Sequence, residues 1–64
     1  MSFRKARIRA GLRVRDVAKA LGVSEAMVYL WETGRNYPKS SRLAKVAELY
    51  GVTVDELISP EERK

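Results

Sequence analysis

The sequence contains no cysteine and no histidine. Without cysteine, disulfides and thiolate metal sites are excluded as means of stabilising the fold. Without histidine, the commonest general base and metal ligand is missing. No segment approaches the roughly 20 apolar residues that a membrane-spanning helix needs, and the basic N-terminus has too few apolar residues for a signal peptide. We therefore expect a cytoplasmic protein that has no metal, no cofactor and no contact with a membrane.

The chain has 64 residues, which is enough for one domain. A domain of this size buries only about 60% of the surface that its unfolded chain exposes, so we expect modest stability. The sequence shows no internal repeat, low-complexity tract or linker. We therefore expect a single domain over residues 1–64, with its core over residues 3–58 and a C-terminal tail over residues 59–64.

Capping residues and glycines predict an all-α fold, a compact five-helix bundle. The expected segments are a helix up to residue 10, helices over residues 14–21, 25–33 and 40–50, and a short helix up to residue 58. Ser59 and Pro60 can begin a further turn. The apolar residues that share single helix faces form the expected core: Phe3, Ala6, Leu12, Val17, Ala18, Leu21, Val23, Val28, Trp31, Leu43, Val46, Ala47, Tyr50, Val52, Leu57 and Ile58.

The second and third of these segments have the pattern of a helix-turn-helix. Ala18 is small enough for two helices to cross closely, and Gly22 can take a positive φ at the end of the first helix. Ser24 can cap the second helix by accepting a backbone N–H bond. Val28 and Trp31 then recur at the i, i+3 spacing of a single buried stripe. The second helix of such a unit is suited to the DNA major groove.

Basic side chains are concentrated near the N-terminus. Residues 4–19 contain seven lysines and arginines and a single acid, Asp16, whereas residues 51–64 contain four acids and two bases. A solvated basic helix is the plain explanation of such a run. Its position beside a helix-turn-helix instead favours one face of the domain turned toward a polyanion.

The chain resembles the Cro and lambda-repressor-type family of helix-turn-helix regulators, often called XRE-type. The resemblance covers about residues 3–58 and is carried by GLRVRDVAKALGVSEAMVYLWETGR, then YP, then LAKVAELYGVTVDEL. It implies a five-helix lambda repressor-like DNA-binding domain that binds operator DNA, usually as a symmetric dimer. Many members repress or activate transcription. We therefore expect a small sequence-specific transcriptional regulator, more specifically a repressor.

The resemblance also implies roles for individual residues. Arg7 and Glu32 stand at the positions of the family's interhelical arginine–glutamate pair, which holds the DNA-reading helix against the first helix. The base-contacting positions of the family fall on the outer side of the third helix, at Glu25, Ala26, Tyr29 and Leu30. None of these four residues is a lysine or an arginine, so we expect modest sequence specificity. The expected base contacts are apolar contact with thymine methyl groups and a hydrogen bond from cytosine N4 to Glu25.

Affinity must then depend largely on the DNA backbone. Arg13 and Arg15 lie at the start of the second helix, and Val14 stands there at a position where the family often has Gln. A polar cluster follows the third helix and reaches the start of the fourth. The expected phosphate-contacting residues are Arg13, Val14, Arg15, Thr33, Arg35, Asn36, Lys39 and Arg42.

Two other function classes stay open at this point. The first is a protein-interaction module of the same fold, such as an antitoxin or antirepressor partner, because Met27, Tyr29 and Leu30 are good interface residues. The second is an enzyme. The acidic residues of this chain are scattered over the helices without the spacing of an acid–base pair or a metal site, so we expect no enzymatic activity.

High affinity for DNA usually needs two copies of such a domain, one helical turn of DNA apart. Val54, Leu57 and Ile58, with the tail after Pro60, can form the two-fold contact, or they can belong to the core. We expect a weak homodimer that assembles on an inverted repeat.

Overall fold

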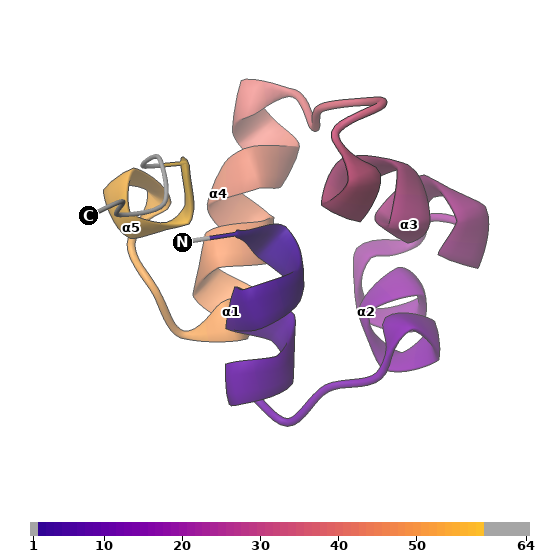
Figure 1. Ribbon diagram of the computed structural model, residues 1–64, viewed down its shortest axis with the longest axis horizontal. Coiled ribbons are helices and arrows are strands. Elements are labelled where there is room, and N and C mark those ends of the chain that lie inside the picture. The colour runs from indigo at the N-terminus through magenta and orange to yellow at the C-terminus, as the bar shows by residue number, and fades with distance from the viewer. Residues whose placement is uncertain (1, 59–64) are drawn as a thin grey trace.

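The computed structural model describes residues 2–58, and these form five helices joined by short loops (Figure 1). The all-helical expectation is confirmed. The helices are α1 (Phe3–Arg9), α2 (Val14–Leu21), α3 (Glu25–Thr33), α4 (Ser40–Tyr50) and α5 (Val54–Ile58). Their bounds agree with the expected segments, except that α1 ends at Arg9 and Ala10 is its C-cap. The expected turn at Ser59 lies outside the described residues.

Local capping explains where the helices begin and end. The Ser2 hydroxyl accepts a bond from the Lys5 N–H at 3.0 Å, and the Ser24 hydroxyl accepts one from Met27 N–H at 3.1 Å. At α5, Thr53 and Glu56 form the reciprocal capping box, with bonds of 2.9 and 3.0 Å. Each cap satisfies a backbone N–H that the first helical turn leaves without a partner.

The core is apolar, and it includes most of the residues that the helix periodicity selects. Its buried members are Phe3, Ala6, Val14, Val17, Ala18, Val28, Trp31, Leu43, Val46, Ala47, Tyr50 and Leu57. Leu12, Leu21, Val23 and Val52 are partly buried against it.

Two residues near helix ends differ from the expected core. Ile58 is 44% exposed, so its assignment to the core was wrong. It follows the buried Leu57 directly, and a step of 100° along a helix turns the next side chain away from that face. Val14 is buried although it was placed outside the core, because it shares a face with Val17 and Ala18 at i, i+3 and i+4.

In the fold, α1 and α4 lie side by side between the remaining helices (Figure 1). The short α5 packs on one side of this pair, and α2 and α3 lie on the other. The arrangement leaves the α2–α3 unit at the edge of the described part of the chain, with one face of α3 uncovered by the other helices of residues 2–58. No helix in residues 2–58 combines the length and the apolar character needed to cross a bilayer.

Candidate nucleic-acid interface

The turn between α2 and α3 is tight because Gly22 takes a left-handed conformation. Its φ is +71°, a region that glycine enters at little steric cost. The chain then reverses, and Val23 N–H donates to the carbonyl of Ala18 at 3.0 Å. Two residues later α3 begins against α2. The helix-turn-helix that the sequence predicts is therefore present in the structure.

The orientation of α3 is fixed by its buried stripe. Val28 is fully buried and Trp31 is 5% exposed, so the opposite face of the helix points outward. Glu25, Ala26 and Tyr29 are exposed on this outer side, whereas Leu30 is half-buried.

Ser24, which precedes α3, is exposed and does not extend the buried stripe of Val28 and Trp31. As the N-cap it has an extended backbone (φ −78°, ψ 158°), and the 100° step of the helix does not apply to it.

The loop after α3 is fastened to that helix by the side chain of Asn36. Its Nδ2 donates to Met27 Sδ at 3.2 Å, and its Oδ1 accepts from Tyr37 N–H at 2.7 Å. The N–H groups of Arg35 and Asn36 both donate to the carbonyl of Leu30, at 3.0 and 3.2 Å. These bonds hold the loop at the C-terminal end of α3, a role for Asn36 that no local sequence signal indicated.

Cationic side chains surround the same loop. Arg35, Lys39 and Arg42 are exposed, and Thr33 is exposed at the last position of α3. A hollow of about 460 Å³ lies between the loop and the start of α4, lined by Met27, Trp31, Asn36, Tyr37, Pro38, Lys39, Ser41 and Arg42. Of the predicted cluster, the hollow brings together Asn36, Lys39 and Arg42, whereas Thr33 and Arg35 do not line it.

At the start of α2, Arg13 and Arg15 are exposed. Asp16 accepts from the N–H and the Nε of Arg13, at 3.1 and 3.3 Å, and the backbone bond is the main cause that lowers the pKa of Asp16. The expected phosphate contact through the side chain of Val14 is contradicted, because this side chain is buried. Only the backbone N–H of Val14, in the first turn of α2, can donate a hydrogen bond to a phosphate oxygen.

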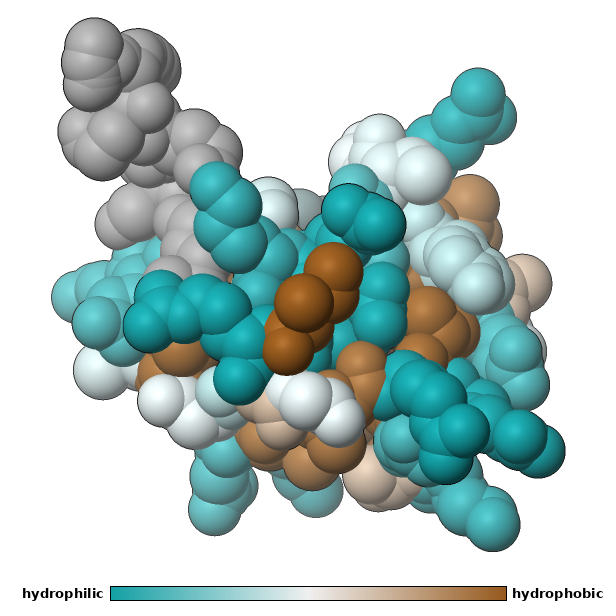
Figure 2. All heavy atoms as spheres, turned by 60° about the horizontal axis from the view of Figure 1, so that its bottom comes forward, coloured by the Kyte–Doolittle hydropathy of each residue, from teal (hydrophilic) through white to brown (hydrophobic). Residues whose placement is uncertain are grey.

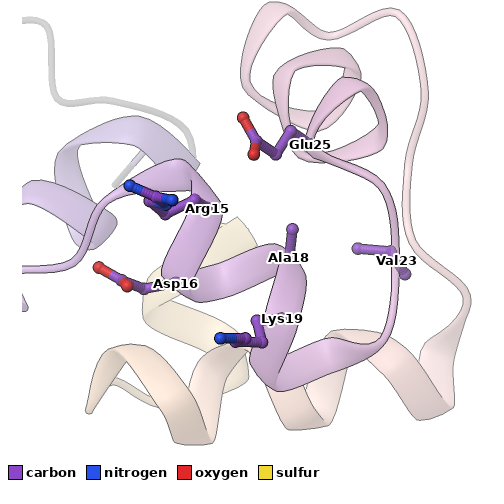
Figure 3. Close-up of a pocket in the computed structure, with 6 residues that line it drawn as sticks. All are labelled: Arg15, Asp16, Ala18, Lys19, Val23 and Glu25. Atoms are coloured by element: carbon purple, nitrogen blue, oxygen red, sulfur yellow. The ribbon is translucent and has the colours of Figure 1, made fainter.

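A second hollow, of about 390 Å³, lies between α2 and the first residue of α3 (Figure 3). Arg15 and Lys19 from α2 and Glu25 from α3 bring both charge signs to it, and Asp16, Ala18 and Val23 complete the lining. Lys19 was not among the predicted site residues. Lys19 stands one helical turn after Arg15, and this spacing could have indicated that the two side chains share one face of α2.

The α2–α3 unit is held to α1 by an ion pair. Arg7 Nε and Nη2 contact the two carboxylate oxygens of Glu32 at 2.5 and 3.2 Å, and Arg7 Nη1 donates to the carbonyl of Leu12 at 3.0 Å. The hydrogen bond to Glu32 raises the pKa of Arg7. The pair that the resemblance implies is thus present, and it connects α1 to the end of α3.

Several large apolar side chains of residues 2–58 are exposed. The large exposed ones are Ile8, Tyr29, Tyr37 and Ile58, which come from four different segments of the chain. Figure 2 shows one face on which small apolar areas emerge between hydrophilic side chains.

The capped α2–α3 turn, the outward face of α3 and the clamp to α1 define a helix-turn-helix DNA-binding domain of the Cro and lambda-repressor type. The chain belongs to the helix-turn-helix domain family, whose model matches residues 2–58. No solved structure matches the chain significantly.

Two curated proteins are similar to this chain. An HTH-type transcriptional activator, BcrR of Enterococcus faecalis, is 38% identical over 47 residues, which are 73% of this chain and 23% of that protein. The cryptic phage CTXphi transcriptional repressor RstR of Vibrio cholerae is 34% identical over 60 residues, which are 94% of this chain and 54% of that protein. The chain therefore spans only part of the length of either relative.

Proposed function

We propose that this chain binds double-stranded DNA and regulates transcription, with α3 in the major groove. The observation that carries the proposal is the outer face of α3: it is free of protein in residues 2–58, while cationic side chains lie at both of its ends. The similarity to a named activator and a named repressor supports the same function. We favour repression, because the repressor is the relative that matches 94% of this chain.

Within this arrangement, Glu25, Ala26, Tyr29 and Leu30 face the base edges. Ala26 and Leu30 offer apolar contact to thymine methyl groups, and Tyr29 can exchange one hydrogen bond. Backbone contact falls to Arg13 at the start of α2 and, around the C-terminal end of α3 and the loop after it, to Thr33, Arg35, Lys39, Arg42 and the Asn36 amide. Most of the affinity then comes from phosphate neutralisation.

The DNA complex is a homodimer on an inverted repeat. Leu57 is 1% exposed and belongs to the core, which removes it from the candidate contact surface. Ile58 is exposed and Val54 is half-buried, so these two residues of α5 are available to a second copy. The tail after Pro60 lies outside the described residues. Since α5 lies across the α1–α4 pair from α3, the contact leaves both reading helices uncovered.

The direct test is fluorescence anisotropy of a labelled random-sequence duplex titrated with the purified protein at low salt. Binding that weakens steeply as salt is added is the expected result. Absence of binding at low ionic strength would contradict the proposal. A pull-down from lysate in which the chain retains a protein instead would assign the face of α3 to a partner of the antitoxin or antirepressor kind.

A further inference from the structure

The hollow between α2 and α3 places side chains of opposite charge from two helices beside the start of α3. Arg15 and Lys19 extend from α2, and Glu25 is the first residue of α3. In Figure 3 the Glu25 carboxylate extends from α3 toward the side of α2 that carries Arg15. When α3 lies in the major groove, a base edge that faces this hollow meets both the Glu25 carboxylate, a hydrogen-bond acceptor, and the Arg15 guanidinium, a forked donor.

The carboxylate of Glu25 is available to such a ligand. The other acid of the hollow, Asp16, already accepts bonds from Arg13. Across residues 2–58, no hydrogen bond or ion pair engages the Glu25 carboxylate or the Arg15 guanidinium, and both residues are exposed.

The acceptor-only chemistry of Glu25 restricts what it can contact. A phosphate would be repelled by the carboxylate, so phosphate alone does not explain the acid in this position. In the major groove, cytosine presents an N4 amino donor, whereas adenine presents its amino donor beside the N7 acceptor. An ionised carboxylate therefore suits cytosine best. The guanine paired with this cytosine presents O6 and N7, the two acceptors that an arginine fork matches.

We infer that Glu25 and Arg15 together read one C·G base pair in each half-site, Glu25 accepting from cytosine N4 and Arg15 donating to guanine O6 and N7. This inference rests on the proposed DNA binding. It gives Arg15 a contact with a base, whereas the sequence led us to expect a contact with phosphate. Arg15 and Lys19 also offset the repulsion between Glu25 and the neighbouring phosphates. The acidic residue is thereby compatible with binding to a polyanion.

The test is selection of bound duplexes from a random pool, with the wild-type chain, Glu25→Ala, Glu25→Gln and Arg15→Ala. The wild type selects C·G at one position of each half-site. Glu25→Ala lowers the preference for C·G over T·A at that position by about 5- to 150-fold, the range of one good base contact. Glu25→Gln moves the preference toward adenine, which a glutamine amide recognises. All other positions of the selected motif stay the same.

A modified base tests Arg15 separately. With 7-deazaguanine in place of the guanine at that position, the wild-type chain loses affinity because N7 is absent, whereas Arg15→Ala is unaffected by the exchange. Glu48→Ala on α4 is the matched control for loss of an exposed acid, and it leaves the motif unchanged. Circular dichroism of each variant reports that the fold is intact.

Identical motifs from the wild type and Glu25→Ala would overturn the inference, as would a wild-type motif without a C·G position. Both outcomes are distinct from failure of the proposed function, in which the wild-type chain enriches no duplex at all.

Discussion

Arg7 on α1 and Glu32 on α3 form a bidentate ion pair whose side chains are only 11% and 5% exposed. The same guanidinium donates to the carbonyl of Leu12, so one side chain connects α1, the loop after it and the end of α3. Removal of one partner from a buried pair costs about 3–5 kcal/mol, because the other charge stays buried and unpaired. A 64-residue domain has a total stability of about 3–10 kcal/mol. Loss of this partly buried pair is therefore expected to remove a large share of that stability.

Replacement of Glu32 by Gln is expected to lower the free energy of unfolding by about 3 kcal/mol or more. Urea denaturation followed by circular dichroism measures the change. Glu48→Gln, which changes an exposed acid on α4, is the matched control and is expected to stay within about 0.5 kcal/mol of the wild type. Equal stability of the two variants would show that the pair does not hold the helices together.

The hydroxyl of Tyr50 gives the domain a sensitivity to alkaline pH. Tyr50 is 4% exposed, its hydroxyl is buried with no hydrogen-bond partner in residues 2–58, and burial raises its pKa from 10.0 to about 12. Between these two pH values the unfolded chain loses the proton while the folded chain keeps it. Stability that is fully present below pH 10 is therefore lost as the pH approaches 12, by on the order of 2 kcal/mol.

Tyr50→Phe is expected to remove this part of the pH dependence. Near neutral pH the variant should be at least as stable as the wild type, because the lost hydroxyl was buried without a bond and the ring still fills the core. Denaturation curves of both proteins at pH 8, 10 and 11 make the comparison. A parallel loss of stability in both proteins over this range would exclude Tyr50 as the cause.

Cationic residues of the loop after α3 are expected to set the salt dependence of DNA binding. Arg35→Gln or Lys39→Gln each removes an exposed charge, and each should reduce the slope of log K against log salt by about 1. Lys45→Gln on α4 removes the same charge outside this loop and serves as control. Unchanged slopes for the two loop variants would mean that the loop does not reach phosphate.

Leu30→Ala is expected to weaken discrimination at one thymine-containing step by about 1–3 kcal/mol, since Leu30 can offer a thymine methyl only apolar contact. Binding to duplexes with thymine or uracil at that step measures the effect, because uracil lacks the methyl group. If the wild type does not distinguish thymine from uracil at any step, Leu30 is outside the reading surface.

The helices could be predicted from the sequence because their ends are encoded locally. Ser24 caps α3 through a residue three positions away, and Gly22 ends α2 through its own φ. Side-chain burial near helix ends was harder to predict. Val14 and Ile58 are the first and last residues of their helices, where a short apolar stripe does not decide which neighbour covers a side chain.

Contacts of the candidate site that join separate segments of the chain were harder to predict from the sequence. The bond from Asn36 to Met27 joins a loop to a helix through a sulfur atom, and no periodicity signals it. The hollow shared by Arg15 and Glu25 depends on how α2 crosses α3. The pair of Arg7 and Glu32 is equally distant in sequence, and it was foreseen only through the family resemblance.

The proposed dimer makes its own prediction at Ile58. This side chain is 44% exposed at the end of α5, and a contact with a second copy would bury it. Ile58→Lys is expected to weaken binding to a duplex with two inverted half-sites by about tenfold, because full burial of such a side chain is worth about 1.5–3 kcal/mol and a little under half of Ile58 is still exposed in one copy. Binding to a single half-site should not change.

Ile8→Lys is the matched control, since Ile8 is 52% exposed on α1. Anisotropy titrations on both duplexes separate the two effects, and sedimentation of the complex gives its stoichiometry. If one chain per duplex saturates the inverted repeat, or if Ile58→Lys and Ile8→Lys weaken binding equally, the two-fold contact does not involve α5. A selective loss with Ile58→Lys instead assigns the exposed end of α5 to the dimer.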